Sequence, residues 1–125
     1  MTRQAITTRS IAQPVGPFSV AVRRDGLTFV SGQVAQDPAT GALIEGDTAA
    51  QAEQILQNLT AVVEAAGKSL DDVVRVGIYL TDMHDFAAVN QVYASYFADP
   101  HPARTTIAVA ALPLGAAVEM DAIVG

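Results

Sequence analysis

The stretch His101-Pro-Ala-Arg-Thr-Thr-Ile-Ala-Val-Ala-Ala-Leu-Pro-Leu-Gly-Ala-Ala-Val-Glu-Met-Asp-Ala-Ile-Val124 decides the fold. It contains two apolar segments rich in β-forming residues, and a Leu-Pro-Leu-Gly turn separates them. Arg104 interrupts the first segment and Glu119 interrupts the second. Because a charge is seldom kept where burial is expected unless it has a function, we take these two residues as the first candidates for a functional site.

The second segment predicts a strand whose two faces differ. Apolar positions on one face alternate with a mixed set on the other. The first face consists of Val118, Met120, Ala122 and Val124, and the second of Ala117, Glu119, Asp121 and Ile123. The first suits a hydrophobic core. We expect the second to suit an interface between subunits that contains a polar pocket.

Upstream of this stretch the sequence predicts a β-hairpin and a helix. The two hairpin strands, residues 18–24 and 27–31, flank an Asp25-Gly26 turn. The helix runs from Thr48 to Gly67, and Thr48 and Gln51 have the spacing of a capping box. Its apolar residues recur on one face, which we expect to cover the sheet.

A third strand and a second helix complete the upstream pattern. We expect residues 73–80 to form a β-branched strand with these residues on one side: Val74, Val76, Ile78 and Leu80. The second helix, residues 85–97, would carry a stripe of Phe86, Val89, Tyr93 and Phe97. The order β-β-α-β-α-β-β predicts an α+β fold with both helices on one face of a sheet.

Composition limits the classes of protein that fit. The chain has 125 residues, half of them apolar, which suits one domain over residues 1–125. Without a membrane-length apolar run or a secretory leader, we expect a soluble, cytoplasmic protein. Cysteine is absent, so disulfides and thiolate nucleophiles are excluded. The formal charge of −6, with Lys68 as the one lysine, argues against nucleic acid as a partner.

Most common catalytic motifs are missing. His84 and His101 are isolated, which disfavours a metal site, and no Gly-x-Ser-x-Gly elbow occurs. Ser31-Gly32-Gln33 lacks the glycine repeat and lysine of a phosphate-binding loop. Gly32 can indicate either a bulge at a strand end or a close backbone approach to a small ligand, and both interpretations stay open.

Arg104 and Glu119 remain. If the two C-terminal segments form a hairpin, Arg104 lies opposite roughly residue 123, on the order of 13 Å from Glu119, which disfavours a direct ion pair. An arginine can instead donate two parallel hydrogen bonds to a carboxylate, and a glutamate can hold and deprotonate a water. Together the two residues predict a site for a small acid.

Eight strings of residues, spread along the chain, match the motifs of a known family. The strings that carry the resemblance span nearly the whole chain in order: Gly16-Pro-Phe-Ser19, Phe29-Val-Ser-Gly-Gln-Val34, Asp37-Pro-Ala-Thr-Gly41, Gly67-Lys-Ser-Leu-Asp-Asp-Val73, Tyr79-Leu-Thr-Asp-Met-His-Asp-Phe86, Val89-Asn-Gln-Val-Tyr93, Pro102-Ala-Arg-Thr105 and Leu112-Pro-Leu-Gly-Ala-Ala-Val-Glu119. In their order and spacing these strings resemble the Rid (YjgF/YER057c/UK114) family of enamine/imine deaminases. The resemblance implies a chorismate-mutase-like fold, a homotrimer with a central barrel, and ligand clefts between subunits.

The resemblance also implies roles for individual residues. Arg104 matches the arginine that clamps the carboxylate of a 2-imino acid, and Glu119 matches the glutamate that positions the hydrolytic water. Ser31 and Gly32 match the Ser-Gly-Gln strand end, and Asn90 matches a cleft asparagine. We count these residues as catalytic (Arg104, Glu119) or substrate-binding (Ser31, Gly32, Asn90).

Two further cleft positions depart from the family pattern. Phe18 replaces a common tyrosine and so removes a hydroxyl, and Thr106 stands where several members carry a cysteine. The implied reaction is cofactor-independent hydrolysis of small 2-imino or 2-enamino acids, such as the 2-aminoacrylate and 2-aminocrotonate tautomers, to 2-keto acids and ammonia. The alternative is a non-catalytic trimeric protein that binds small 2-keto acids and has a binding or regulatory role.

Overall fold

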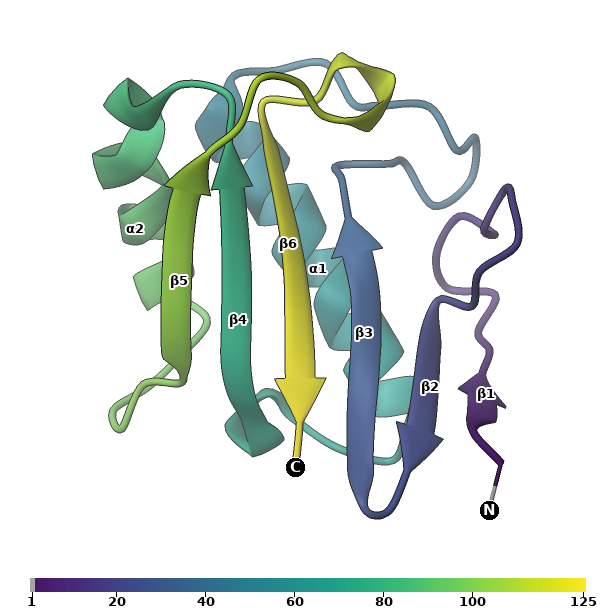
Figure 1. The fold of residues 1–125 in the computed structure, drawn as a ribbon. Helices are drawn as coiled ribbons and strands as arrows, with labels where there is room; N and C mark the ends of the chain where they lie inside the picture. The colour runs from purple at the N-terminus through teal and green to yellow at the C-terminus, as the bar shows by residue number, and fades with distance from the viewer. Residues whose placement is uncertain (1) are drawn as a thin grey trace.

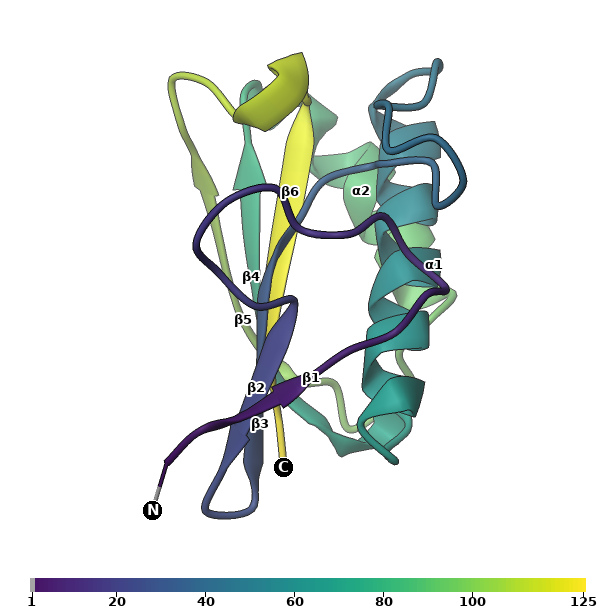
Figure 2. The same cartoon turned by 90° about the vertical axis from the view of Figure 1, so that its right-hand side faces the viewer.

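The computed structural model describes residues 2–125 and contains one sheet of strand order β1-β2-β3-β6-β4-β5 (Figure 1). The strands are β1 (Gln4–Ile6), β2 (Ala21–Arg24), β3 (Leu27–Gln33), β4 (Val73–Leu80), β5 (Ala103–Ala108) and β6 (Val118–Val124). Helices α1 (Thr48–Ala65) and α2 (Phe86–Ala94) both lie on one face of the sheet (Figure 2), as predicted. The other face, which we call the open face, has no covering layer in the described chain.

The β2–β3 hairpin confirms the Asp25-Gly26 turn. Both residues have positive φ, 52° and 78°, which a two-residue type I′ turn requires. Strand β1 was not predicted; it is a three-residue edge strand that pairs with β2. Its short length leaves no room for a readable alternation.

Helix α1 has a different cap from the predicted one. The carboxylate of Asp47, not the Thr48 hydroxyl, accepts a hydrogen bond from the Ala50 N–H at 2.9 Å. Thr48 is therefore the first helical residue, and its hydroxyl donates to Asp85 at 2.8 Å. Gln51 is buried and accepts from the Ala117 N–H at 2.9 Å, which fixes the start of β6.

Strand β4 has the predicted bounds, but at its start the side chains do not lie on the predicted faces of the sheet. Its pairing with β6 shifts register between Val73 and Arg75. Val73 is therefore buried, whereas Val74, which we expected on the core side, is 50% exposed. Helix α2 ends at Ala94 rather than at Phe97, although Phe97 still packs in the core.

The expected C-terminal hairpin is wrong. β5 pairs in parallel with β4 at the edge of the sheet, and β6 lies between β3 and β4, antiparallel to both. A parallel pair requires a crossover connection, and α2 supplies one between β4 and β5. The segment between β5 and β6 then crosses over β4, so the assumed register of Arg104 with residue 123 does not exist.

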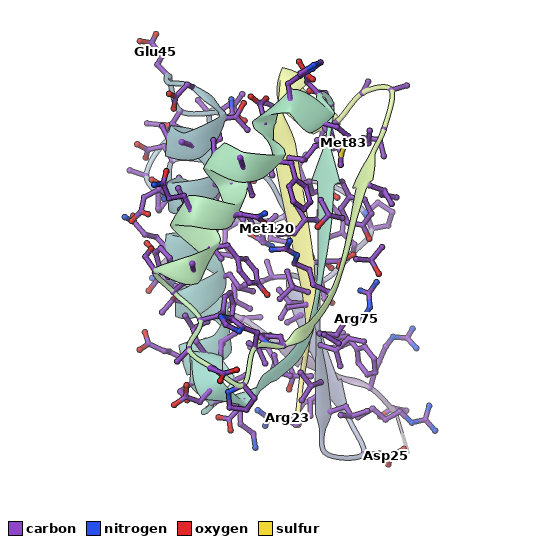
Figure 3. The ribbon with its side chains drawn as sticks, turned by 90° about the vertical axis from the view of Figure 1, so that its left-hand side faces the viewer. Arg23, Asp25, Glu45, Arg75, Met83 and Met120 are labelled. Carbon is purple, nitrogen blue, oxygen red and sulfur yellow. The ribbon has the colours of Figure 1, made fainter. Side chains whose placement is uncertain are left out.

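The alternation along β6 is confirmed. Val118, Met120, Ala122 and Val124 are buried against the helices, and Glu119, Asp121 and Ile123 lie on the open face. Figure 3 shows Met120 between the sheet and the helices and Arg75 on the opposite side. The open face also exposes Phe29, which pairs with Ile123, and Ile107, which pairs with Tyr79, at 41% and 45%. Within residues 2–125, neither helix has the length and apolarity needed to cross a membrane.

Candidate active site

Glu119 projects from the centre of the sheet and leans over Gly32 of β3. A β-carbon at Gly32 would lie 2.9 Å from Glu119 Cδ and would overlap its Oε2 oxygen. The β3–β6 register also shifts between Val30 and Gln33, which confirms the bulge interpretation of Gly32. Glycine is needed here because any side chain would displace the carboxylate.

The Glu119 carboxylate borders an apolar cavity of about 510 Å³. Phe18, Val15 and Leu114 line the cavity, and all three are exposed. Among residues 2–125, Glu119 is the one charged residue of this lining, and its carboxylate forms no hydrogen bond or ion pair. Burial, helped by the nearby charge of Asp121, raises the pKa of Glu119 above its ordinary value. A carboxylate with a raised pKa is a stronger base than an ordinary one, which suits Glu119 to accept a proton from water.

Asp121 leans the other way, over Gly77 of β4. Its carboxylate accepts hydrogen bonds from the Gly77 N–H at 3.1 Å and from the Tyr79 hydroxyl at 2.9 Å. Arg75 Nη1 lies 3.7 Å from Asp121 Oδ1. The hydrogen bond to Asp121 is the main cause that raises the pKa of Tyr79. The two acids of β6 thus have opposite surroundings, since Asp121 is held by three groups and Glu119 by none of the described ones.

Arg104 lies on the other side of the sheet from Glu119. It pairs in register with Val76, a buried residue of the helix-covered face, whereas Glu119 pairs with Tyr79 on the open face. The Arg104 guanidinium carbon is 4.9 Å from the centre of the Tyr93 ring and 5.6 Å from that of Phe86. These are cation–π distances, so two aromatic rings of the α2 segment hold the guanidinium in place.

A smaller cavity, about 260 Å³, opens beside Arg104. It is lined by Asn90, Tyr93, Ala94, His101, Pro102 and Arg104. In the described part of the chain no carboxylate forms a salt bridge with Arg104, so its guanidinium is free to bind an anion. The cavity brings together the predicted residues Arg104 and Asn90.

Two hydroxyl groups near this side of the sheet are buried without a hydrogen-bond partner among residues 2–125. They belong to Tyr93 and to Thr106, which shares the helix-covered face of β5 with Arg104. The Ser31 hydroxyl, by contrast, donates to the Ser19 carbonyl at 2.6 Å. Ser31 therefore secures the β3 strand end, and only Thr106 of these two predicted residues has an unused hydroxyl.

One chain therefore divides the predicted site residues into two groups. Glu119, Gly32 and Phe18 border the larger cavity, and Arg104 and Asn90 border the smaller one. Sequence reasoning assigned Tyr93 and Phe86 to the core stripe of a helix and missed their contact with Arg104. It also left Asp121 without a role, although its alternation with Glu119 was a usable signal.

Metal-ligating groups do not converge in the described residues. No set of three or more His, Asp or Glu side chains in residues 2–125 is arranged to hold an ion. His84 Nδ1 contacts Asp82 Oδ1 at 2.8 Å, and His101 Nδ1 lies 3.7 Å from Asp99. Each histidine thus has one local carboxylate partner near a helix start or a turn.

The six-stranded sheet with two helices on one face, and the cavities beside Glu119 and Arg104, can be compared with known protein families. The family model described as Endoribonuclease L-PSP matches residues 8–125, and the chain belongs to this family, the Rid (YjgF) family. The crystal structure of RidA from an Antarctic Psychrobacter superposes with a TM-score of 0.93 at 45% identity, covering 97% of this chain and 98% of that one. The predicted family and fold are therefore confirmed.

Curated relatives carry several names. Protein DfrA of Myxococcus xanthus is 49% identical over 125 residues, 98% of this chain and 95% of the relative. A mouse protein named 2-iminobutanoate/2-iminopropanoate deaminase is 42% identical over 121 residues, 97% of this chain and 90% of the relative. Relatives at similar identity thus differ in name, and family membership alone does not fix a substrate.

Proposed function

We propose that this protein hydrolyses small 2-imino acids, such as 2-iminopropanoate and 2-iminobutanoate, to 2-keto acids and ammonia in the cytoplasm. One observation carries the proposal. Glu119 is a carboxylate without a hydrogen-bond or ion-pair partner among residues 2–125, has a raised pKa and borders an apolar cavity. The relatives named as deaminases, at 42% identity, support the same reaction.

The chemistry requires little beyond positioning and proton transfer between water, Glu119 and the substrate nitrogen. The carbon of an imine is electrophilic, and the enamine tautomers reach this form by moving one proton. Glu119 accepts a proton from water as the oxygen attacks the imine carbon and then returns a proton to the nitrogen, which gives an amino alcohol. The C–N bond of the amino alcohol then breaks as its hydroxyl proton passes to the nitrogen, so that ammonia leaves and the keto acid remains. Water and imine are consumed, and ammonia and keto acid are released, with no change of oxidation state.

Arg104 supplies the complementary charge. Its guanidinium can donate two parallel hydrogen bonds to the substrate carboxylate, a geometry that lysine cannot reproduce. Tyr93 and Phe86 hold it at cation–π distance, so little freedom is lost on binding. Asn90 borders the same cavity and offers an amide to the substrate, and the unused hydroxyl of Thr106 lies on the same face.

We further propose that the working site forms between copies of the chain in a homotrimer. Arg104 and Glu119 lie on opposite faces within one chain, so a small substrate cannot touch both there. The exposed apolar residues Phe29 and Ile107 give the open face a surface for another copy to cover. A cleft between copies would place the Arg104 of one against the Glu119, Gly32, Ser31 and Phe18 of the next.

Two other functions have support of their own. Phe18 lacks the hydroxyl of tyrosine, which favours a protein that binds 2-keto acids without turnover. The family model is described as an endoribonuclease, which suggests RNA cleavage as another function. The formal charge of −6 argues against it, because phosphate contacts need Lys and Arg.

The test is keto-acid release from imines generated in place by an amino-acid oxidase acting on alanine or 2-aminobutanoate. We expect the protein to raise hydrolysis above the buffer rate, and Arg104→Ala to return it to that rate. Binding of pyruvate without acceleration contradicts the proposal and supports the binding protein. Cleavage of single-stranded RNA that Arg104→Ala abolishes, with no imine hydrolysis, supports the ribonuclease.

A further inference from the structure

Strand β6 presents two acids on the open face, two residues apart, and the fold treats them differently. Glu119 and Asp121 each lean over a glycine of a flanking strand, Gly32 on β3 and Gly77 on β4. The carboxylates therefore diverge while their Cα atoms remain about 7 Å apart along the strand. Two acids at this spacing influence each other's titration whenever one of them stays ionised.

Asp121 is the acid whose carboxylate has partners on the neighbouring strand. It accepts hydrogen bonds from the Gly77 N–H and the Tyr79 hydroxyl, and Arg75 lies 3.7 Å away. Hydrogen bonds donated to a carboxylate and a nearby guanidinium both favour its charged form. Tyr79 is the register partner of Glu119, yet its hydroxyl donates to the diagonal neighbour Asp121. The fold thus directs the available donors of β4 to Asp121.

Glu119 has a different set of neighbours. Its neighbour on β6 is Asp121. On β4 its neighbours are Tyr79 and Arg75, and Arg75 lies next to Asp121. On the β3 side and in the cavity lining, the described residues are uncharged. Within one chain, the fixed charge that acts on Glu119 is therefore the negative charge of Asp121, and it disfavours ionisation of Glu119, in agreement with the direction of the Glu119 pKa.

We propose that Asp121 is a positioning residue whose fixed negative charge sets the pH range in which Glu119 can accept a proton. The inference rests on the proposed function, because it concerns the same general base. Asp121 does not touch the substrate in this scheme. Its role is electrostatic, and Tyr79, Gly77 and Arg75 serve by holding its charge in place.

The direction of the effect follows from charge alone. Asp121→Asn removes the negative charge and leaves Arg75 uncompensated, and both changes favour ionised Glu119. The titration midpoint of Glu119 should therefore move to lower pH. Arg75→Gln has the opposite sign, because it leaves the charge of Asp121 unbalanced, and should move the midpoint to higher pH.

Glu119 can be observed directly, without relying on turnover. In protein labelled with carboxyl-¹³C glutamate, the Glu119 resonance is assigned by its loss in Glu119→Gln, and its midpoint is read from a pH titration. We expect the low-pH limb of the pH–rate profile to move in parallel. Asp121→Glu retains the charge and should keep the midpoint above that of Asp121→Asn.

The matched control is Glu45→Gln, which removes one negative charge from an exposed loop residue on the helix side of the molecule (Figure 3). It should leave the Glu119 midpoint unchanged. An unchanged midpoint in Asp121→Asn, or an equal shift in Glu45→Gln, overturns the proposal. If Asp121→Asn does not fold, the Arg75→Gln variant tests the proposal instead. A Glu119 midpoint that is unchanged or lower in Arg75→Gln than in wild type overturns the proposal.

This design separates the inference from the proposed function. If the midpoints shift as expected while no variant hydrolyses imines, the proposed function fails and the coupling between Asp121 and Glu119 stands. If wild type hydrolyses imines but the midpoint ignores Asp121, the function stands and the inference fails.

Discussion

Gly32 and Glu119 share one small volume at the junction of β3 and β6. A β-carbon at Gly32 would lie 2.9 Å from Glu119 Cδ, closer than real contacts of this kind allow. The carboxylate therefore rests directly on the β3 backbone, and its direction depends on the absence of a single methyl group.

Gly32→Ala should accordingly displace the Glu119 carboxylate and leave the fold intact. A shift of about 1 Å at a catalytic group can lower the rate by about 10²-fold, and we expect a loss of that order in kcat for imine hydrolysis. Binding of pyruvate through Arg104 should persist, as measured by calorimetry. Unchanged kcat in this variant would contradict the role assigned to the Glu119 position.

Arg104→Ala should remove carboxylate binding. Losing a charge-assisted clamp costs about 2–5 kcal/mol, so kcat/KM for imines should fall by about 30- to 5,000-fold. Arg104→Lys should recover little, because an ammonium cannot donate the two parallel bonds. Steady-state kinetics with 2-iminobutanoate tests both variants, and near-normal kcat/KM in the alanine variant removes Arg104 from the site.

The open face should mediate assembly. We expect a trimeric mass by light scattering at micromolar concentration, and we expect Ile107→Glu to reduce it by placing a charge in the interface. Met83→Glu is the matched control, since Met83 is a similarly exposed apolar residue of the segment before α2. A monomeric wild type, or equal dissociation by both variants, would rule out this interface.

Two tyrosines of the α2 region provide a matched pair for stability. The Tyr96 hydroxyl donates to Glu53 Oε1 at 2.5 Å, whereas the Tyr93 hydroxyl is buried without a partner among the described residues. Tyr96→Phe should lower the free energy of unfolding by about 1–2 kcal/mol, and Tyr93→Phe should leave it unchanged or raise it. Urea unfolding at constant protein concentration measures both. A larger loss in Tyr93→Phe would show that its hydroxyl has a partner in the assembled protein.

Local patterns in the sequence were sufficient for much of the fold. The Asp25-Gly26 turn, the stripe of α1 and the alternation of β6 each depend on neighbours in sequence, and each is confirmed. The pairing of β5 with β4 was missed because adjacency in sequence favours a hairpin, and only the α2 crossover makes the parallel pair possible.

The site was predictable in its residues but not in its arrangement. Arg104 and Glu119 stood out as charges within apolar strands, yet their opposite faces follow from strand order, which no local pattern encodes. Gly32 was predicted as a site residue, but its contact with Glu119 and the contact of Gly77 with Asp121 were not. The second contact spans 44 positions of sequence, so no local pattern indicates it.

Glu119→Gln separates an enzyme from a binding protein. The substitution keeps the shape of the side chain and removes the base, so the variant should still bind pyruvate or 2-ketobutanoate while turnover falls by about 10²–10⁴-fold. The raised pKa of Glu119 also has a consequence for wild-type activity, which should decline as the pH drops through that pKa and the base becomes protonated.

The same raised pKa fixes the sign of a stability effect. A carboxyl whose pKa is higher in the folded than in the unfolded state favours folding at low pH, and this contribution is lost as the pH rises through the folded-state value. Glu119→Gln should therefore be more stable than wild type at neutral pH, and the difference should vanish in acid, where both side chains are neutral. Denaturant unfolding across this pH range measures the difference. If the two proteins have equal stability at every pH, bind keto acids equally and neither hydrolyses imines, Glu119 is not a desolvated base and the binding-protein alternative replaces the enzyme.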